Sequence, residues 1–206
     1  MGDRRLRLLP YRYYHATTAI IVVSVIAFFI ASSDRSVLAS LALQRAVLGE
    51  RLWTPLTYLF VHAPGGLFST HLLVNMLGLY WFGTPVERSV GSSEFLWLYL
   101  GAGVAAGLVA IAPAGATAVI GASGAVFAVM VVFATLFPDA RITLFFFLPL
   151  RAPVAVLVFA AISVVFSLSG GLSGISHLAH LGGLVAGGLY SYLRLGRNPV
   201  DAFLRR

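Results

Sequence analysis

The sequence predicts an all-α polytopic membrane protein, with six transmembrane helices and a first loop that is partly embedded in the membrane. Hydrophobic residues make up 59% of the 206-residue chain and charged residues only 10%, whereas about a quarter of the residues of a soluble domain are charged. The mean hydropathy is +0.93. Apolar runs close to the roughly 20 residues that span a bilayer recur along the chain, and in a bilayer such runs form helices because these satisfy their own backbone hydrogen bonds.

The first apolar run, residues 16–31, follows a basic N-terminal segment and is expected to be an uncleaved first transmembrane helix. Segment and run together are similar to a signal peptide, and Ala31-Ser32-Ser33 could serve as a cleavage site. Because several further spans follow, a retained helix with a cytoplasmic N-terminus is favoured. The basic residues before it are Arg4, Arg5, Arg7 and Arg12.

Residues 32–67 form a long connection of mixed polarity. The connection carries charges such as Asp34 and Glu50, but also too many large apolar residues for a flexible linker. Short amphipathic pieces lying in the membrane interface fit this composition best, with Trp53 and Tyr58 at the depth of the lipid headgroups. This first loop is therefore expected to be partly embedded in the membrane.

Five more spans are expected after this loop. Gly101, Gly103 and Gly107 in the third span favour close helix packing. A turn at Pro138-Asp139 ends the fourth span. Residues 142–150 are apolar but are closed by a proline and an arginine, so we expect them to lie in the interface. The spans are predicted at residues 67–86, 95–112, 123–137, 153–166 and 175–195, with a glycine- and serine-rich loop at 167–173.

The arginines support a topology with both termini in the cytoplasm, in a multi-pass protein of the cell (inner) membrane. Six spans divide the chain into a basic cytoplasmic segment (1–15), a membrane domain (16–195) and a basic cytoplasmic tail (196–206). The net charge of +7 follows from this topology rather than from a basic stripe for nucleic acid. Eleven arginines fall on the cytoplasmic side (Arg4, Arg5, Arg7, Arg12, Arg88, Arg141, Arg151, Arg194, Arg197, Arg205 and Arg206) and three on the other (Arg35, Arg45 and Arg51).

The segment Gly121-Ala122-Ser123-Gly124 places a serine between glycines at the start of the fourth span. The first N–H groups of a helix have no intrahelical partner and carry partial positive charge. A serine at this position therefore lies beside donors for an oxyanion, and the glycines allow a substrate backbone to approach. The alternative is small-residue helix packing, for which Gly-x-Ser-Gly is also typical.

Polar side chains inside the membrane gather at one level, near the non-cytoplasmic face. His71 and Asn75 share one face of the second span, and His177 and His180 lie on the sixth. Gly183 and Gly187 continue the face of His180 and favour close approach of another helix. If that helix is the fourth span, Gly124 contributes to the contact and His180 lies next to Ser123.

These residue types favour nucleophilic catalysis by a Ser123–His180 dyad. Neutral histidine is a suitable base for a serine near neutral pH. No third member is predicted, because all seven Asp and Glu residues lie at or beyond span ends. Phe127, one turn after Ser123, is placed to stack on the imidazole. The candidate oxyanion donors are the Ser123 N–H, the Asn75 amide and His71, and Gly121 and Ala122 complete the oxyanion and substrate-binding segment.

Other interpretations of the same residues remain open. His71 and Asn75 could be interhelical hydrogen-bonding residues, and His177 is better explained as an interface histidine. A transition-metal site of His71, His177 and His180 is disfavoured because no carboxylate is near and the chain has no cysteine. The absence of cysteine also excludes disulfides and thiol catalysis. Glu87-Arg88 is expected to be a structural pair at a span end.

In their order along the chain these motifs resemble the rhomboid intramembrane serine proteases of bacterial type, from the first span to the sixth. The matching pieces are His71-x-x-x-Asn75, Gly83-x-x-x-Glu87 with Gly91-Ser92, Gly121-x-Ser123-Gly124, and Ala179-His180-x-x-Gly183-x-x-x-Gly187. The resemblance implies a six-helix rhomboid-like bundle and a Ser123–His180 dyad in a water-filled cavity open to the outer face. It also implies an oxyanion site from His71, Asn75 and the Ser123 backbone.

Two features depart from the family pattern. The first loop reads Trp53-Thr54 where the family commonly has Trp-Arg, so that the arginine's role is absent or taken by Arg51. His62 lies nine residues before His71, and Pro64-Gly65-Gly66 lengthens a spacing that is usually tighter. Both departures concern the shape of the first loop and neither involves the dyad.

The expected function is cleavage of transmembrane protein substrates near the outer end of their helix. The alternatives are a non-cleaving rhomboid-like protein that binds transmembrane clients, and a small transporter or proton relay. Inactive relatives typically lack the serine or the histidine, and a transport path would need polar residues across the whole bilayer. The expected partners are transmembrane substrates and membrane lipid, and no cofactor, metal or nucleic acid is expected.

Overall fold

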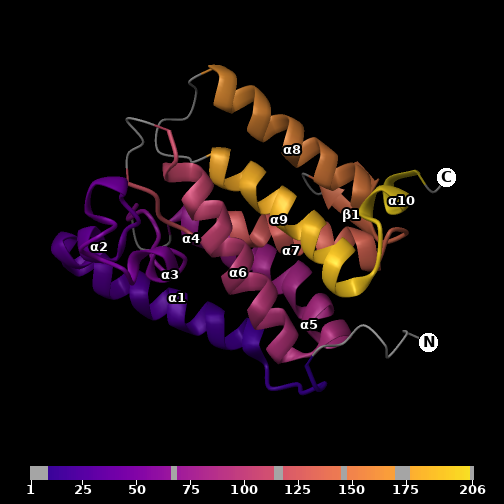
Figure 1. Cartoon of the computed structure of the whole chain (residues 1–206), viewed down its shortest axis with the longest axis horizontal. Helices are drawn as coiled ribbons and strands as arrows, with labels where there is room; N and C mark the ends of the chain where they lie inside the picture. The colour runs from indigo at the N-terminus through magenta and orange to yellow at the C-terminus, as the bar shows by residue number, and fades with distance from the viewer. Residues whose placement is uncertain (1–8, 66–68, 114–117, 145–147, 170–176, 205–206) are drawn as a thin grey trace.

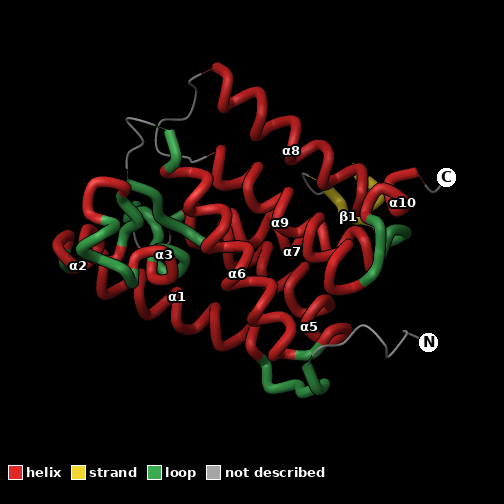
Figure 2. Tube along the Cα trace, viewed as in Figure 1, coloured by secondary structure: helices red, strands yellow, loops and turns green. Residues whose placement is uncertain are grey.

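The structure is a computed structural model that describes residues 9–65, 69–113, 118–144, 148–169 and 177–204. It is mostly helical, with loops gathered toward the two ends of a bundle (Figure 2). The longer helices are α1 (Ala16–Ser33), α4 (Thr70–Gly78), α6 (Ser92–Ile111), α7 (Ser123–Leu136), α8 (Ala152–Ser169) and α9 (His177–Leu195). The shorter elements are α2 (Arg35–Leu41), η2 (Arg45–Val47), α3 (Thr54–Thr57), η3 (Leu79–Gly83), α5 (Thr84–Val90), β1 (Arg141–Leu144), β2 (Leu148–Arg151) and α10 (Pro199–Leu204).

Helix α7 lies at the centre of the bundle. In Figure 1, α6 and α9 cross over it, α1 runs along one side and α8 along the other. Small residues such as Gly124, Ala125 and Ala128 let the neighbouring helices approach α7, and most of its side chains are buried. The N-terminus of α7, which carries Ser123, is thereby held inside the bundle.

Glycines bring α9 against α7. A methyl group added at Gly187 would lie 2.5 Å from the carbonyl oxygen of Ala128, and one at Gly183 would overlap the carbonyl oxygen of Gly124. A methyl group at Gly124 would meet Ala106 of α6 at 2.7 Å. The three helices therefore touch through backbone and small side chains, which fixes where α9 presents its own side chains to α7.

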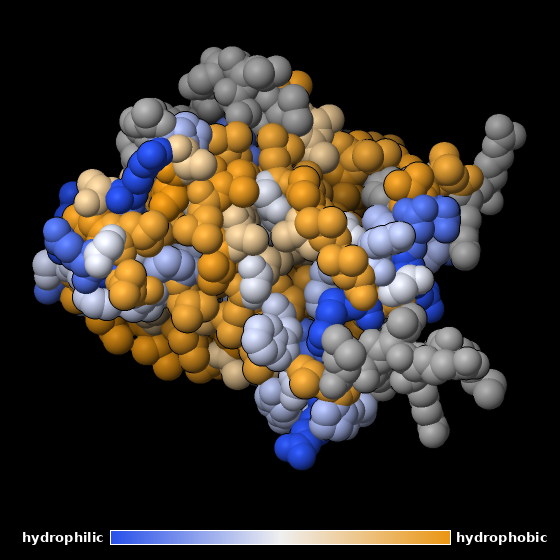
Figure 3. Space-filling model, viewed as in Figure 1, coloured by the Kyte–Doolittle hydropathy of each residue, from blue (hydrophilic) through white to orange (hydrophobic). Residues whose placement is uncertain are grey.

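The surface between the ends of the bundle is apolar. Figure 3 shows hydrophobic side chains over the helices and hydrophilic ones toward both ends of the visible face. Among the described residues, Ala16–Ser33 and Ser92–Ile111 are long and apolar enough to cross a membrane. Ser123–Leu136 and Ala152–Ile162 are shorter apolar helices. The number of six spans stays a prediction.

Several expected boundaries differ from the structure. The second apolar segment, expected at 67–86, extends to Val90 and contains the π-helical turn η3 between α4 and α5. Helix α8 continues through Ser169, into the loop expected at 167–173. The basic tail expected at 196–206 contains α10, and just before it the Asn198 side chain accepts a hydrogen bond from Val200 N–H at 3.1 Å. Arg4, Arg5, Arg7, Gly66, Arg205, Arg206 and residues 170–176 lie outside the described residues.

The all-α prediction is wrong for residues 141–144 and 148–151. Strands β1 and β2 pair antiparallel there, with Ile142 opposite Leu150 and Thr143 opposite Pro149. An ion pair joins the end of β2 to the turn before β1, where Arg151 Nη2 lies 2.8 Å from Asp139 Oδ1. A short apolar run has no periodicity that separates a strand from an interfacial segment, which explains why the sequence pattern was ambiguous here.

The first loop packs on α6 through aromatic and aliphatic side chains. A methyl group at Gly103 would meet Leu59 at 2.6 Å, and one at Gly107 would meet Leu43 at 2.7 Å and Tyr58 at 2.8 Å. The Tyr58 hydroxyl donates a hydrogen bond of 2.6 Å to the Gly103 carbonyl. Gly103 and Gly107 thus allow the first loop, rather than another helix, to pack closely on α6.

Glu87 binds the N-terminus of α1 and is fully buried. Its carboxylate accepts hydrogen bonds from Ala16 N–H at 2.6 Å and Thr17 N–H at 2.9 Å, and from the Ser92 hydroxyl. A carboxylate in this position satisfies N–H groups that have no intrahelical partner and complements the helix dipole. The structural role expected for Glu87 therefore rests on contacts with α1 rather than on a pair with Arg88.

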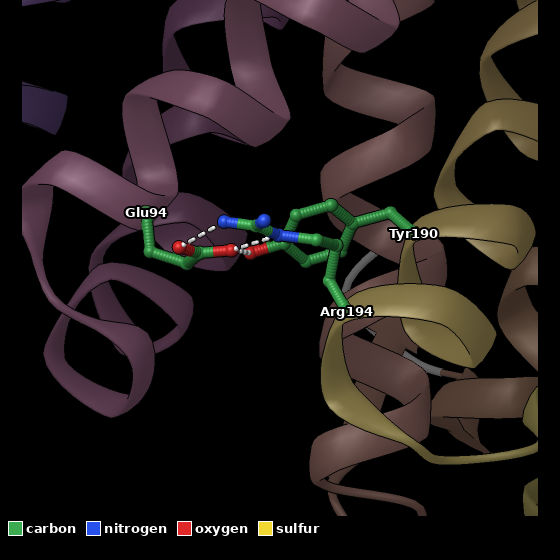
Figure 4. A network of polar contacts seen from close by, with 3 residues as sticks. All are labelled: Glu94, Tyr190 and Arg194. Atoms are coloured by element: carbon green, nitrogen blue, oxygen red, sulfur yellow. Dashed lines mark hydrogen bonds and ion pairs between the residues drawn. The ribbon is translucent and has the colours of Figure 1, made fainter. Parts of the chain in front are cut away.

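Glu94, in the first turn of α6, joins that helix to the last turns of α9 (Figure 4). The carboxylate of this residue, whose side chain is only 5% exposed, accepts two hydrogen bonds from Arg194, at 2.8 Å and 2.7 Å. Tyr190, one turn earlier on α9, donates a third at 3.0 Å. A bidentate guanidinium–carboxylate contact of this kind fixes the relative orientation of the two side chains and compensates the buried negative charge of Glu94.

Replacing Arg194 by methionine is expected to lower the free energy of unfolding by about 2 kcal/mol, because the buried Glu94 carboxylate would lose its counter-charge. Chemical denaturation of the detergent-solubilised protein measures the effect. The double variant Glu94→Gln/Arg194→Met removes both charges and should recover part of the loss. An Arg194→Met variant as stable as the unmodified protein would contradict the interpretation.

Candidate active site

Ser123 is the first residue of α7 and follows a turn that requires glycine. Gly121 has φ +106°, a conformation that residues with a side chain rarely adopt. A methyl group at Gly121 would also lie 2.6 Å from Nε2 of His71. The turn therefore brings the His71 imidazole against the backbone two residues before Ser123, and the Ser123 N–H lies at the helix end without an intrahelical partner.

His180 lies within hydrogen-bond distance of Ser123. The two side chains, from α9 and α7, place His180 Nε2 2.8 Å from Ser123 Oγ. The Phe127 ring stacks on the imidazole, with centroids 4.4 Å apart and planes 13° apart. This stack holds the ring in the orientation that directs Nε2 at the hydroxyl. Among the described residues, the buried carboxylates are those of Glu87 and Glu94, and both bind other partners.

His71 is oriented by a backbone hydrogen bond. Its Nδ1 accepts the N–H of Ala63 at 3.3 Å. Because a neutral imidazole has one N–H, an acceptor at Nδ1 places the hydrogen on Nε2, the atom that faces Gly121. His71 can therefore act as a hydrogen-bond donor beside Ser123 without carrying a charge.

Asn75 lies one turn further along α4 and is almost fully buried. Its Nδ2 donates a hydrogen bond of 2.7 Å to the His71 carbonyl. This contact uses one of the two amide hydrogens and joins Asn75 to the same turn of helix as His71. The structure thus brings Ser123, His180 and Phe127 together and places His71 against the turn before Ser123, with Asn75 one turn beyond His71 on the same helix.

The backbone N–H groups of Gly121 and Ala122 are engaged within the protein. Gly121 donates to the Tyr58 carbonyl at 2.9 Å, and Ala122 donates to Nε2 of His62 at 3.4 Å. These two residues were expected in the oxyanion and substrate-binding segment. In this structure their N–H groups hold the turn to the first loop, and an oxyanion site from His71, Asn75 and the Ser123 N–H stays a prediction.

His62 belongs to this cluster, although sequence reasoning treated it only as a mark of unusual spacing. The residue is 1% exposed, and its ring lies edge-on to that of His71 with centroids 5.2 Å apart. Burial and, secondly, the neighbouring His71 lower the pKa of His62 to about 3, so the ring is neutral at pH 7. The sequence did offer one signal for His62: it lies in an apolar loop, nine residues before the candidate site residue His71.

His177 lies beside His180, with ring centroids 5.7 Å apart at 89°, and is buried. Among the described residues, no three histidine or acidic side chains come together as metal ligands.

Two cavities of about 550 Å³ lie away from the dyad: one includes Thr135, Asp139 and Arg197, and the other follows α6 near Trp97. The water-filled cavity at the dyad stays a prediction.

The comparisons with known proteins agree with these motifs. The family model of the Rhomboid domain matches residues 49–197. The "RHOMBOID-like protein 12, mitochondrial" of Arabidopsis thaliana is 36% identical over 167 residues, which is 71% of this chain and 48% of the relative. The "Rhomboid protein 1, mitochondrial" of Saccharomyces cerevisiae is 39% identical over 134 residues, 59% of this chain and 37% of the relative.

A bacterial relative matches as well. The "Rhomboid protease GluP" of Bacillus subtilis is 30% identical over 154 residues, 75% of this chain and 28% of the relative. The chain thus matches less than half the length of each relative. Because two of the three are mitochondrial, the narrower assignment to the bacterial type is not supported. The family match over most of its length shows that the chain belongs to the rhomboid family of membrane-embedded proteins.

Proposed function

We propose that this protein is an intramembrane serine endopeptidase that cleaves transmembrane proteins near the outer end of their helix. The observation that carries the proposal is the 2.8 Å contact between His180 Nε2 and Ser123 Oγ. The name of the relative "Rhomboid protease GluP" supports the same reaction class. A serine with an adjacent histidine base is the arrangement that nucleophilic catalysis needs.

In the proposed reaction, His180 Nε2 takes the proton of Ser123 as Oγ bonds to the carbonyl carbon of the substrate. The negative charge on the carbonyl oxygen is received by His71 Nε2–H, the Asn75 amide and the Ser123 N–H. Collapse of the tetrahedral species breaks the C–N bond, and His180 gives its proton to the leaving amine. A water molecule, deprotonated by His180, then hydrolyses the acyl-enzyme and regenerates Ser123.

The proposed topology has six spans: α1, the α4–η3–α5 segment, α6, α7, α8 and α9. Ser123, His71 and His180 all begin their helices at the end of the bundle that carries α2 and α3 (Figure 1). At the opposite end lie six described arginines, Arg12, Arg88, Arg141, Arg151, Arg194 and Arg197. The positive-inside rule makes that end cytoplasmic, so the dyad faces the outer side of the membrane.

Cleavage of a model substrate tests the proposal. The purified protein in liposomes, without added metal or nucleotide, is expected to cut a single-span substrate that has glycine or alanine near its outer helix end, where the helix is weak. Mass spectrometry of the products locates the cut. If the unmodified protein binds such substrates without cutting any of them, the protease proposal fails and the protein is a client-binding member of the family.

A further inference from the structure

His62 lies between the two halves of the proposed oxyanion site. One half is His71, whose ring centroid is 5.2 Å from that of His62. The other half is the turn before Ser123, where Ala122 N–H donates to His62 Nε2 at 3.4 Å. A single imidazole from the first loop therefore contacts both α4 and the start of α7.

The residue after His62 makes a second contact with His71. Ala63 N–H donates to His71 Nδ1, which selects the His71 tautomer with its hydrogen on Nε2. The position of the Ala63 backbone follows from that of His62, whose side chain is almost fully enclosed. Burial of His62 thus determines where the N–H that orients His71 can lie.

The loop that carries His62 is itself anchored close to the site. Tyr58 donates its hydroxyl to α6 and accepts the Gly121 N–H at its carbonyl. Leu43 and Val119 exchange two backbone hydrogen bonds, of 3.0 Å and 2.8 Å. Residues 119–122 are therefore hydrogen-bonded to three residues of the first loop: Leu43, Tyr58 and His62.

We propose that His62 is a positioning residue that fixes His71 Nε2–H and the Ser123 N–H relative to one another. This inference rests on the proposed function, because it assigns His62 a part in forming that same oxyanion site. His62 does not contact the reacting atoms and acts through His71 and Ala122. Oxyanion donors stabilise a transition state only when they are held where the charge develops, so small displacements reduce the rate strongly.

Two variants separate the hydrogen bond from the bulk of the side chain. His62→Phe keeps a ring in the pocket but has no acceptor for the Ala122 N–H. His62→Gln has a carbonyl oxygen at about the reach of Nε2 and can accept that hydrogen bond. We expect His62→Phe to lower kcat by about 10-fold to 100-fold, with KM nearly unchanged, and His62→Gln to recover most of it.

A double-mutant cycle tests whether His62 acts through His71. In a His71→Ala background the oxyanion donor of His71 is already lost, so adding His62→Phe should lower kcat by less than about threefold. The reason is that the effects of two residues that act as one unit do not add. All kcat values are expressed per active site, titrated with a fluorophosphonate that labels the nucleophilic serine. A merely structural role would lower the melting temperature and the titrated fraction but leave kcat per site unchanged, which would overturn the inference.

The tautomer of His71 gives a readout that does not depend on cleavage. In ¹⁵N-histidine spectra of the protein in micelles, we expect His71 to be in the Nε2–H tautomer. The His62→Phe variant should show a mixture of His71 tautomers, and the His62→Gln variant should again show the Nε2–H tautomer. If His62→Phe changes neither this signal nor kcat per site while the unmodified protein cleaves, the inference fails and the proposed function stands. If the signal changes but the unmodified protein cleaves no substrate, the proposed function fails and the part of His62 in an oxyanion site fails with it, while the orientation of His71 by His62 is established.

Discussion

Replacing Ser123 or His180 by alanine is expected to lower kcat by about 10⁴-fold to 10⁶-fold, below detection in a gel assay. Ser123→Ala removes the atom that forms the acyl-enzyme, and His180→Ala removes the base 2.8 Å from it. The two losses should not add, because serine without its base and the base without its serine are both inactive. The double variant is therefore expected to be no slower than either single variant.

The measurement is the initial rate of cleavage of a single-span substrate in liposomes, at equal amounts of folded protein. His15→Asn is a suitable control, because His15 is an exposed residue before α1 with φ 57°, a conformation that asparagine tolerates. This variant should cleave at the unmodified rate. Cleavage that survives Ser123→Ala would exclude the serine mechanism, and cleavage that survives His180→Ala alone would assign the base to another residue.

Much of the helical framework could be predicted from the sequence because it depends on local patterns. Long apolar runs and flanking charges located α1, α6, α7 and α9 to within a few residues of their ends. The glycines around Ser123 and after His180 indicated a close contact between two helices, and the structure has α9 against α7 at Gly183 and Gly187. In a membrane such patterns carry more information than in water, because small residues there mark helix contacts and polar residues mark functional sites or interhelical hydrogen bonds.

The parts that escaped prediction depend on contacts between distant residues. Glu94 and Arg194 are 100 residues apart in the chain, and each has the appearance of an ordinary charge at a span end. The paired strands β1 and β2 have no periodic pattern that distinguishes them from an interfacial segment. The position of His62 depends on how the first loop folds back over α6 through Tyr58, and no sequence spacing encodes that path.

Adding one methyl group at Gly183 is expected to lower the free energy of unfolding by about 1–3 kcal/mol and to abolish most cleavage. A Cβ at this position would overlap the Gly124 carbonyl oxygen, which belongs to the backbone and cannot rotate away. Helix α9 would have to move outward from α7 to relieve the overlap. Because His180 lies one turn before Gly183 on the same helix, that movement would also lengthen its contact with Ser123.

The same chemical change at Gly101 provides the matched control. A Cβ there meets no atom within 4 Å, and the residue lies within α6, so Gly101→Ala should keep full activity and stabilise the helix by up to about 1 kcal/mol. Thermal unfolding in detergent and cleavage per titrated serine measure both variants. If Gly183→Ala were as stable and active as Gly101→Ala, close packing of α9 on α7 would not be what holds His180 against Ser123. If Gly183→Ala loses stability and activity while Gly101→Ala keeps both, the α7–α9 contact is the place where a residue without a side chain is needed. That contact is also where His180 meets Ser123.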